Sequence, residues 1–184
     1  MAIYIILGII VIIFIYILII YNSFINSRNL VKEAFSTMDI YLKKRWDIIP
    51  NLVEVVKGYS DYEKETLIQI TSLRNASYDE LSMDNKIDIN EKISKYLSNI
   101  LAVSENYPEL KANEMFSKLA DNLVKIEDEI ANSRKYYNGT VRIFNNKIQM
   151  FPNNIVANLF GFKAYKMFEA EVEEKNNVGV NFNE

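Results

Sequence analysis

Polar side chains that could act together occur in two stretches that lie far apart in the sequence. They are Arg45, Asp47 and Asn51 in the first third of the chain, and Arg134, Asn138 and Asn145 near its C-terminal end. Successive helical residues are about 100° apart, so the second group falls in one sector of a helix beside an apolar seam. A buried polar group without a partner destabilises a fold. We therefore expect the two groups to form one structural network that sets how the helices pack. A polar groove for a partner peptide is the alternative.

The residue types needed for most enzymatic chemistry are missing. The chain has no His and no Cys, which removes the commonest general base, the commonest metal ligand and any thiolate site. Glu127, Asp128 and Glu129 are consecutive, so they point in different directions around a helix and are typical of a solvated face. No glycine-rich phosphate loop and no serine in a nucleophile motif occurs. The sequence predicts a protein that is not an enzyme and that holds no cofactor and no metal.

The charge balance excludes a further class of partner. The formal net charge is −3, so the chain has no basic footprint for nucleic acid. Of the cations that follow the N-terminal segment, only Arg28 and Lys32 lie close enough to it to meet lipid headgroups. A continuous helix would carry Lys43 about 30 Å further, well beyond a Debye length of about 8 Å.

The N-terminal segment predicts a membrane anchor at residues 1–27. It carries no charged side chain, and Ala2 to Tyr21 is almost wholly apolar. A helix of this length spans about 30 Å, which is the thickness of the hydrocarbon core. A cleaved signal peptide would need preceding basic residues, a shorter apolar run and a small-residue cleavage site, and the sequence has none of these. We therefore expect residues 2–21 to span a lipid bilayer once.

The orientation of the anchor follows from the basic residues around it. Arg28 and Lys32 come after the apolar run and no basic side chain precedes it, so the positive-inside rule favours a cytoplasmic domain. The opposite orientation stays open, because only these two cations lie close to the span.

Beyond the anchor, the spacing of apolar residues predicts helices throughout. With few glycines and prolines and no alternating apolar run, strands are not expected. The expected helices cover residues 26–47, 50–76, 89–107 and 109–150, with a break at Pro50, a loop over 77–88 and a stop at Pro152. Asp88 and Glu91 have the spacing of a capping box. Residues 154–168 are expected to form a short apolar helix or turn that folds back.

The last long helix carries a heptad seam in which apolar residues recur at alternating intervals of four and three. The seam consists of Ala112, Phe116, Leu119, Leu123, Ile126, Ile130, Ser133, Tyr137, Val141, Phe144, Ile148 and Phe151. One extra interval of four beside Gly139 is a stutter, where we expect the helix to unwind locally. The predicted fold is all-α: a membrane helix followed by an antiparallel, four-helix-type bundle at residues 28–168. An acidic tail at residues 169–184 is expected to be mobile.

Three blocks of the sequence resemble the LemA family of bacterial proteins. They are residues 21–63 (from YNSFINSRNLVKEAF to GYSDYE), residues 104–130 (SENYPELKANEMFSKLADNLVKIEDEI) and residues 132–162 (NSRKYYNGTVRIFNNKIQMFPNNIVANLFGF). The resemblance implies one N-terminal membrane helix, a helical bundle and no established biochemical activity. The family's polar positions correspond to Asn22, Arg28, Asn29, Arg45, Asp47, Asn51, Arg134, Asn138, Asn145 and Pro152. Tyr62 stands where the family often has His, so no metal or proton-transfer role carries over to that position.

An anchor joined to a bundle without a catalytic constellation predicts a function through binding. We expect a scaffold or adaptor for protein partners at the inner or plasma membrane of a bacterium. The alternative is a structural or membrane-remodelling protein of the cell envelope that acts by self-association, in which the heptad seam continues between subunits and the chain is a homo-oligomer.

Overall fold

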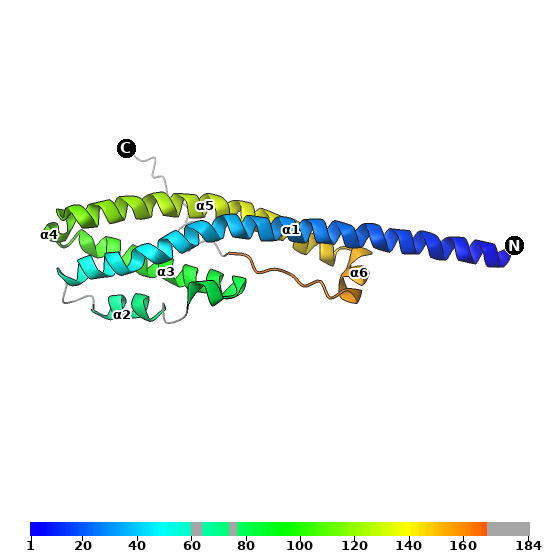
Figure 1. Cartoon of the computed structure of the whole chain (residues 1–184), viewed down its shortest axis with the longest axis horizontal. Coiled ribbons are helices and arrows are strands. Elements are labelled where there is room, and N and C mark those ends of the chain that lie inside the picture. The colour runs from blue at the N-terminus through cyan, green and yellow to red at the C-terminus, as the bar shows by residue number, and fades with distance from the viewer. Residues whose placement is uncertain (60–63, 74–76, 169–184) are drawn as a thin grey trace, which may run out of the picture.

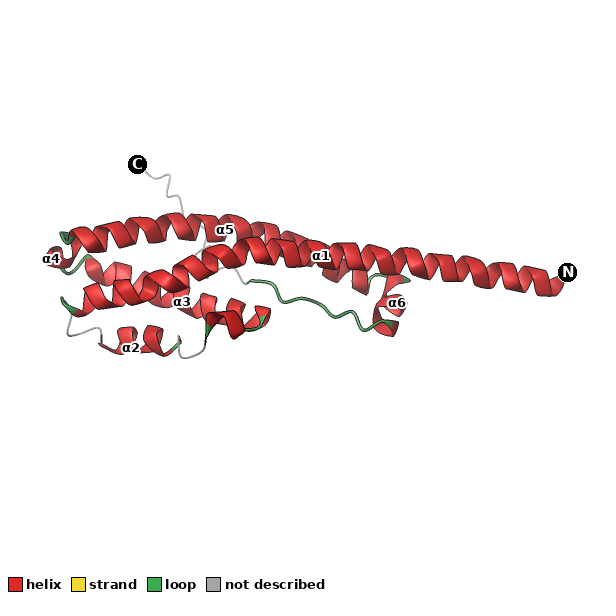
Figure 2. Ribbon diagram, in the orientation of Figure 1, coloured by secondary structure: helices red, strands yellow, loops and turns green. Residues whose placement is uncertain are grey.

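The computed structural model describes residues 1–59, 64–73 and 77–168, and these form helices joined by short connections (Figure 2). Within those ranges no strand occurs, which confirms the all-α prediction. The helices gather around the last two thirds of a very long first helix, whose first third projects alone toward the N-terminus (Figure 1). The predictions for Tyr62 and for the tail at residues 169–184 lie outside the described residues.

Helix α1 (Ala2–Lys57) is one continuous element of 56 residues. At about 1.5 Å per residue it is roughly 84 Å long. Its first third is long and apolar enough to cross a membrane, and only 6% of the most apolar window is buried within the chain. A core helix of a soluble protein would bury most of such a window. The segment at residues 2–21 is therefore a candidate membrane span.

The break predicted at Pro50 is wrong, because α1 continues through it to Lys57. A proline inside a helix costs roughly 3 kcal/mol, since it has no N–H to donate to the preceding turn. Its neighbours Ile49, Leu52 and Val53 are all buried, with at most 5% of each exposed. Burying one such side chain contributes about 1.5–3 kcal/mol, so packing outweighs the local cost.

The chain then returns along the bundle through α2 (Lys64–Ser72), passes a turn of 3-10 helix η1 (Tyr78–Glu80) and reverses again into α3 (Met83–Ser104), which runs parallel to α1 (Figure 1). Helix α3 begins well before Asp88, so the predicted loop over 77–88 and its capping box are corrected. The backbone N–H of Asn85 instead donates to the hydroxyl of Ser82 at 3.2 Å, and this satisfies a free donor of the first turn.

The long C-terminal helix begins later than predicted. A short α4 (Pro108–Lys111) precedes α5 (Glu114–Gln149), and Asn113 between them caps α5 by accepting a hydrogen bond from the backbone N–H of Phe116 at 3.0 Å. Helix α5 runs antiparallel to α1, its main packing partner (Figure 1). It runs unbroken past Gly139 and ends at Gln149. Phe151 therefore leaves the predicted seam and is 80% exposed.

After α5, a short α6 (Asn153–Leu159) turns the chain around. Residues 163–168, which we call the strap, then run without regular secondary structure back along the bundle (Figure 1). Only the first part of the predicted stretch 154–168 is thus helical.

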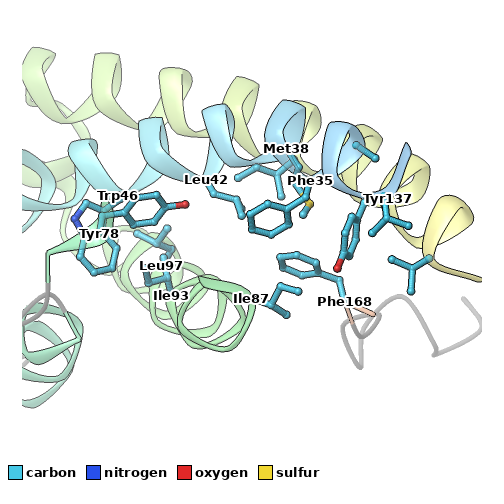
Figure 3. Close-up of a cluster of buried hydrophobic side chains, with 14 of the residues drawn as sticks. Phe35, Met38, Leu42, Trp46, Tyr78, Ile87, Ile93, Leu97, Tyr137 and Phe168 are labelled. Carbon is cyan, nitrogen blue, oxygen red and sulfur yellow. The ribbon is translucent and has the colours of Figure 1, made fainter. Parts of the chain in front are cut away.

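The core joins the three long helices (Figure 3). Aromatic and aliphatic side chains of α1 meet those of α3 and α5, and Phe168 at the end of the strap closes one side. The labelled members are Phe35, Met38, Leu42, Trp46, Tyr78, Ile87, Ile93, Leu97, Tyr137 and Phe168, all of them buried.

Candidate functional site

Two asparagines on α5 hold the strap by its backbone. The side chain of Asn145 donates to the carbonyl oxygen of Tyr165 at 2.9 Å and accepts from the backbone N–H of the same residue at 2.9 Å. Asn138 does the same with Phe168, at 2.9 and 3.0 Å. A carboxamide carries the same donor and acceptor as a peptide group. Each asparagine therefore pairs with the strap as a neighbouring strand would; we call this pair the asparagine ladder.

The spacing of the ladder matches the geometry of the two elements. Asn138 and Asn145 are seven residues apart on a helix, which corresponds to about 10.5 Å. Tyr165 and Phe168 are three residues apart, and an extended chain covers about 10 Å in that distance. The two repeats coincide only if the strap is extended and runs antiparallel to α5, which is the arrangement observed. The seven residues between Asn138 and Asn145 therefore keep both side chains on one side of α5 and also match the distance between Tyr165 and Phe168 of the strap.

Side chains reinforce the ladder at both ends. The Tyr137 hydroxyl donates to the carbonyl oxygen of Lys166 at 2.8 Å, and burial raises the pKa of this phenol above its ordinary value. The ammonium of Lys166 pairs with Asp88 on α3, and this hydrogen bond raises the pKa of Lys166. The Tyr165 ring packs against Phe144 with centroids 5.3 Å apart. The strap thus joins α5 to α3.

A second cluster lies deeper, around Arg45 of α1, whose side chain is 1% exposed. One guanidinium nitrogen donates to Ser94 at 2.7 Å and to both carboxylate oxygens of Glu127 at 2.9 Å. The other donates to the backbone and side-chain oxygens of Asn90 at 2.8 and 2.9 Å. Arg45 therefore ties α1 to α3 and α5 at once. Charge-assisted bonds of this kind are the stronger hydrogen bonds in proteins.

A third group extends this cluster along α1. Asp39 accepts from the Tyr78 hydroxyl at 2.7 Å and from the Lys86 ammonium at 2.7 Å. The ammonium also lies 4.5 Å from the centroid of the Tyr78 ring. Burial, followed by the hydrogen bond to Asp39, raises the pKa of Tyr78, so the phenol stays protonated well into alkaline solution. The group holds η1 and the start of α3 against α1.

The structure does not bring the six predicted network residues together, although all six lie in its described ranges. Arg45 pairs within the bundle, and Asn138 and Asn145 pair with the strap. Asp47 instead faces Lys43 in an exposed i,i+4 pair at 3.6 Å, and Asn51 is exposed. Arg134 is half-buried on α5 and has interactions of its own. Arg45 on the one hand, and Asn138 and Asn145 on the other, thus bind different partners.

Sequence reasoning missed the partners of Arg45. Glu127 is not part of a solvated face, because it binds the guanidinium, whereas Asp128 and Glu129 are exposed as predicted. One signal for Arg45 was available: it follows Leu42 by three residues and precedes Ile49 by four, which is the interval of a buried seam. A cation at such a position requires an anion on a facing helix.

In the polar clusters of the described residues, the charged side chains bind groups on neighbouring helices and do not have the arrangement of a catalytic site. Glu127 and Asp39 each face a cation, and no group of acidic side chains in those residues has the arrangement of a metal site. Buried cations that join one helix to another, as Arg45 and Lys86 do, are typical of a structural support.

Comparison with known proteins identifies the family. The family model named LemA family matches residues 34–182, which includes the Arg45 cluster, the ladder and the strap. This chain belongs to the LemA family. "Protein LemA" of Metamycoplasma hominis is 26% identical over 85% of this chain and 72% of its own length. "Magnetosome protein MamQ 2" of Paramagnetospirillum magneticum is 23% identical over 81% of this chain. "Magnetosome protein MamQ" of Magnetospirillum gryphiswaldense is 20% identical over 80%.

This LemA family chain spans 64% of the length of the magnetosome proteins that it matches. None of these relatives is named as an enzyme. Family membership and a candidate membrane span together fit a membrane-associated protein.

Proposed function

We propose that this LemA family protein is a non-catalytic scaffold or adaptor that presents a rigid helical bundle to protein partners at the cytoplasmic face of a bacterial membrane. Residues 1–27 form its single-pass anchor and residues 28–168 its bundle. The observation that carries the proposal is the continuity of α1, which passes from the candidate span into the bundle core without a break.

Continuity of the helix has a mechanical consequence. A flexible linker would let a domain wander over the membrane surface, whereas a helix transmits the direction of the span to the bundle. From Tyr21 to Lys57 the helix extends about 54 Å. Helices α3 and α5 brace this portion through Arg45 and the buried core. The α4 end of the bundle is thereby held at a set distance from the bilayer, as a platform for partners.

Crosslinking in native membranes tests the scaffold proposal. A photoreactive amino acid at Met115, which is 60% exposed at the α4 end of α5, should give discrete adducts that mass spectrometry identifies as the same protein in repeated experiments. The same group at Ile10 within the candidate span serves as a control, because it should yield lipid adducts instead. Recovery of the chain without a reproducible protein partner at Met115 contradicts the proposal.

Sidedness has its own test. Protease added to intact cells, after removal of any wall or outer barrier, should leave the bundle uncut, and cleavage should follow permeabilisation. Digestion of the tail before permeabilisation contradicts the cytoplasmic orientation.

Self-association in the cell envelope is the second candidate function. The sequence suggested that the heptad seam of α5 continues between subunits. However, Leu123, Ile130 and Phe144 of that seam are buried within the chain. A homo-oligomer would therefore need another face. Sedimentation of the full chain in detergent decides the matter, because a monomer at all concentrations leaves self-association without support.

A further inference from the structure

Five large apolar side chains gather where α5 ends and α6 turns the chain. Each is exposed by about half or more: Met150 62%, Phe151 80%, Ile155 60%, Leu159 70% and Phe160 48%. Soluble surfaces rarely expose so many apolar side chains together, and such a patch marks an interaction site. We call it the α6 patch.

The α6 patch lies at the level where the candidate span ends. The Phe160 ring packs on Tyr21 with centroids 4.9 Å apart, and the Phe162 ring packs on Phe24 at 5.0 Å. Tyr21 is the last residue of the apolar run, so its ring belongs at the membrane–water interface if the run spans. Helix α6 sits at the end of the bundle that faces the N-terminal half of α1 (Figure 1).

One face of the α6 region packs on the bundle and another is left uncovered. Val156 and Ala157 are buried, at 5% and 2% exposure. Ile155 and Leu159 are four residues apart on α6, so they share a different side of that helix, and Phe151 is exposed in the turn that precedes it. The bundle covers one side of α6, and its uncovered apolar side is available to lipid, as is the apolar face of a helix that lies in a membrane interface.

The charges around the α6 patch complement an anionic lipid surface. Residues 130–168 contain no Asp or Glu, and the first acidic side chain after the N-terminus is Glu33. Arg28, Lys32 and Lys163 line a shallow hollow beside Phe162, to which Asp84 contributes the one carboxylate among the described lining residues. Lys147 lies at the same level, where its ammonium donates to the Ser27 hydroxyl at 2.7 Å. Anionic headgroups attract such a cluster of cations.

We propose that the α6 patch inserts into the headgroup and upper acyl region of the same bilayer that α1 spans. The membrane-proximal end of the bundle then contacts the bilayer at two places, through α1 and through the α6 patch, instead of through α1 alone. Two contacts fix both the depth and the tilt of the bundle. This proposal rests on the anchorage proposed above.

Single-cysteine spin labels on the full chain test the proposal, because the sequence has no cysteine of its own. Leu159→Cys carries the label in the α6 patch, and Ile10→Cys carries it in the candidate span. Ile40→Cys is the matched aqueous control, since Ile40 is 56% exposed and lies about 28 Å along the helix beyond Tyr21. The chain is reconstituted in vesicles of phosphatidylethanolamine and phosphatidylglycerol. Collision rates with oxygen and with a water-soluble nickel chelate are then measured by electron paramagnetic resonance.

We expect the labels at positions 159 and 10 to collide several-fold more often with oxygen than with nickel, and the label at position 40 to show the reverse. Nickel access at position 159 equal to that at position 40, with position 10 protected, overturns this proposal and leaves the anchorage intact. Nickel access at position 10 overturns both. Excess lipid dilutes the protein in the membrane. If the label at position 159 then becomes accessible to nickel, a second copy of the chain had covered the patch, and this result also overturns the proposal.

Discussion

Asn145→Ala is the change that most directly tests how the strap is held. The substitution removes one donor and one acceptor, and with them both hydrogen bonds to Tyr165. Asn145 is half-buried on α5, so truncation opens no large cavity and leaves helix propensity unharmed. The predicted effect is therefore confined to the contact between α5 and the strap.

The expected magnitude follows from these two bonds. A hydrogen bond contributes about 1 kcal/mol net, because water replaces it when the strap opens. Loss of both lowers the free energy of strap opening by about 2 kcal/mol, which corresponds to a roughly 30-fold larger open population. Amide exchange at Tyr165, which depends on that population, should accelerate by the same factor.

Hydrogen–deuterium exchange of the full chain in lipid nanodiscs measures this effect, with a peptide that covers residues 163–168. Asn146→Ala is the matched control, because its side chain is exposed one residue away on the same helix. Adding Asn138→Ala should extend fast exchange to Phe168, where the second pair of bonds is lost. Equal exchange of the strap in Asn145→Ala and Asn146→Ala would refute the view that the ladder holds it.

Four further predictions concern α1 and its partners, and urea unfolding of the full chain in detergent, followed by the fluorescence of the single Trp46, measures all of them. Arg45→Met leaves buried oxygens unpaired and should lower the free energy of unfolding by about 3 kcal/mol. Glu127→Gln keeps a hydrogen bond to the guanidinium but leaves the buried Arg45 cation without its anion, so it should lower the free energy of unfolding by about 2 kcal/mol; an unchanged free energy of unfolding would contradict the role of Glu127 as the counter-ion. Burial raises the pKa of Tyr78 above its ordinary value of 10, so the folded state keeps a proton that the unfolded state loses. Its contribution is complete below pH 10 and falls as the pH rises further, and Tyr78→Phe should flatten that decline by up to about 1.4 kcal/mol per pH unit; an unchanged slope would contradict the assignment. Pro50→Ala restores a helix donor and should raise the free energy of unfolding by about 1–2 kcal/mol after the entropy of the unfolded chain is counted; a less stable variant would show that the proline is needed where it stands.

Much of the fold could be predicted from local spacing. The seam residues from Phe116 to Ile148 alternate at intervals of three and four, and Leu123, Tyr137 and Phe144 are indeed buried. The N-terminal apolar run is a continuous helix whose side chains are left exposed by the chain itself. These features depend on periodicity and length, which a sequence displays directly.

The residues at which helices begin and end were harder to predict from the sequence, because they depend on packing. Pro50 is a strong local signal for a helix end, yet α1 passes through it because the residues on both sides are buried. Asp88 and Glu91 have the spacing of a cap, but α3 had already begun at Met83. At each position a local preference of a few kcal/mol or less competes with the burial of several side chains.

By itself, the sequence determined that this protein is all-helical, that its N-terminal run is apolar enough to cross a membrane, and that Asn138 and Asn145 lie on one side of one helix. Only the tertiary structure decided what those side chains bind. Asn145 meets a backbone 20 residues away, and Arg45 meets Glu127 at a separation of 82 residues. Periodicity is local, since it reflects which side of an element avoids water. A hydrogen-bond partner depends instead on the path of the whole chain. A side-chain amide can pair equally well with the backbone of an extended strap or with a side chain on another helix, so its type does not identify its partner.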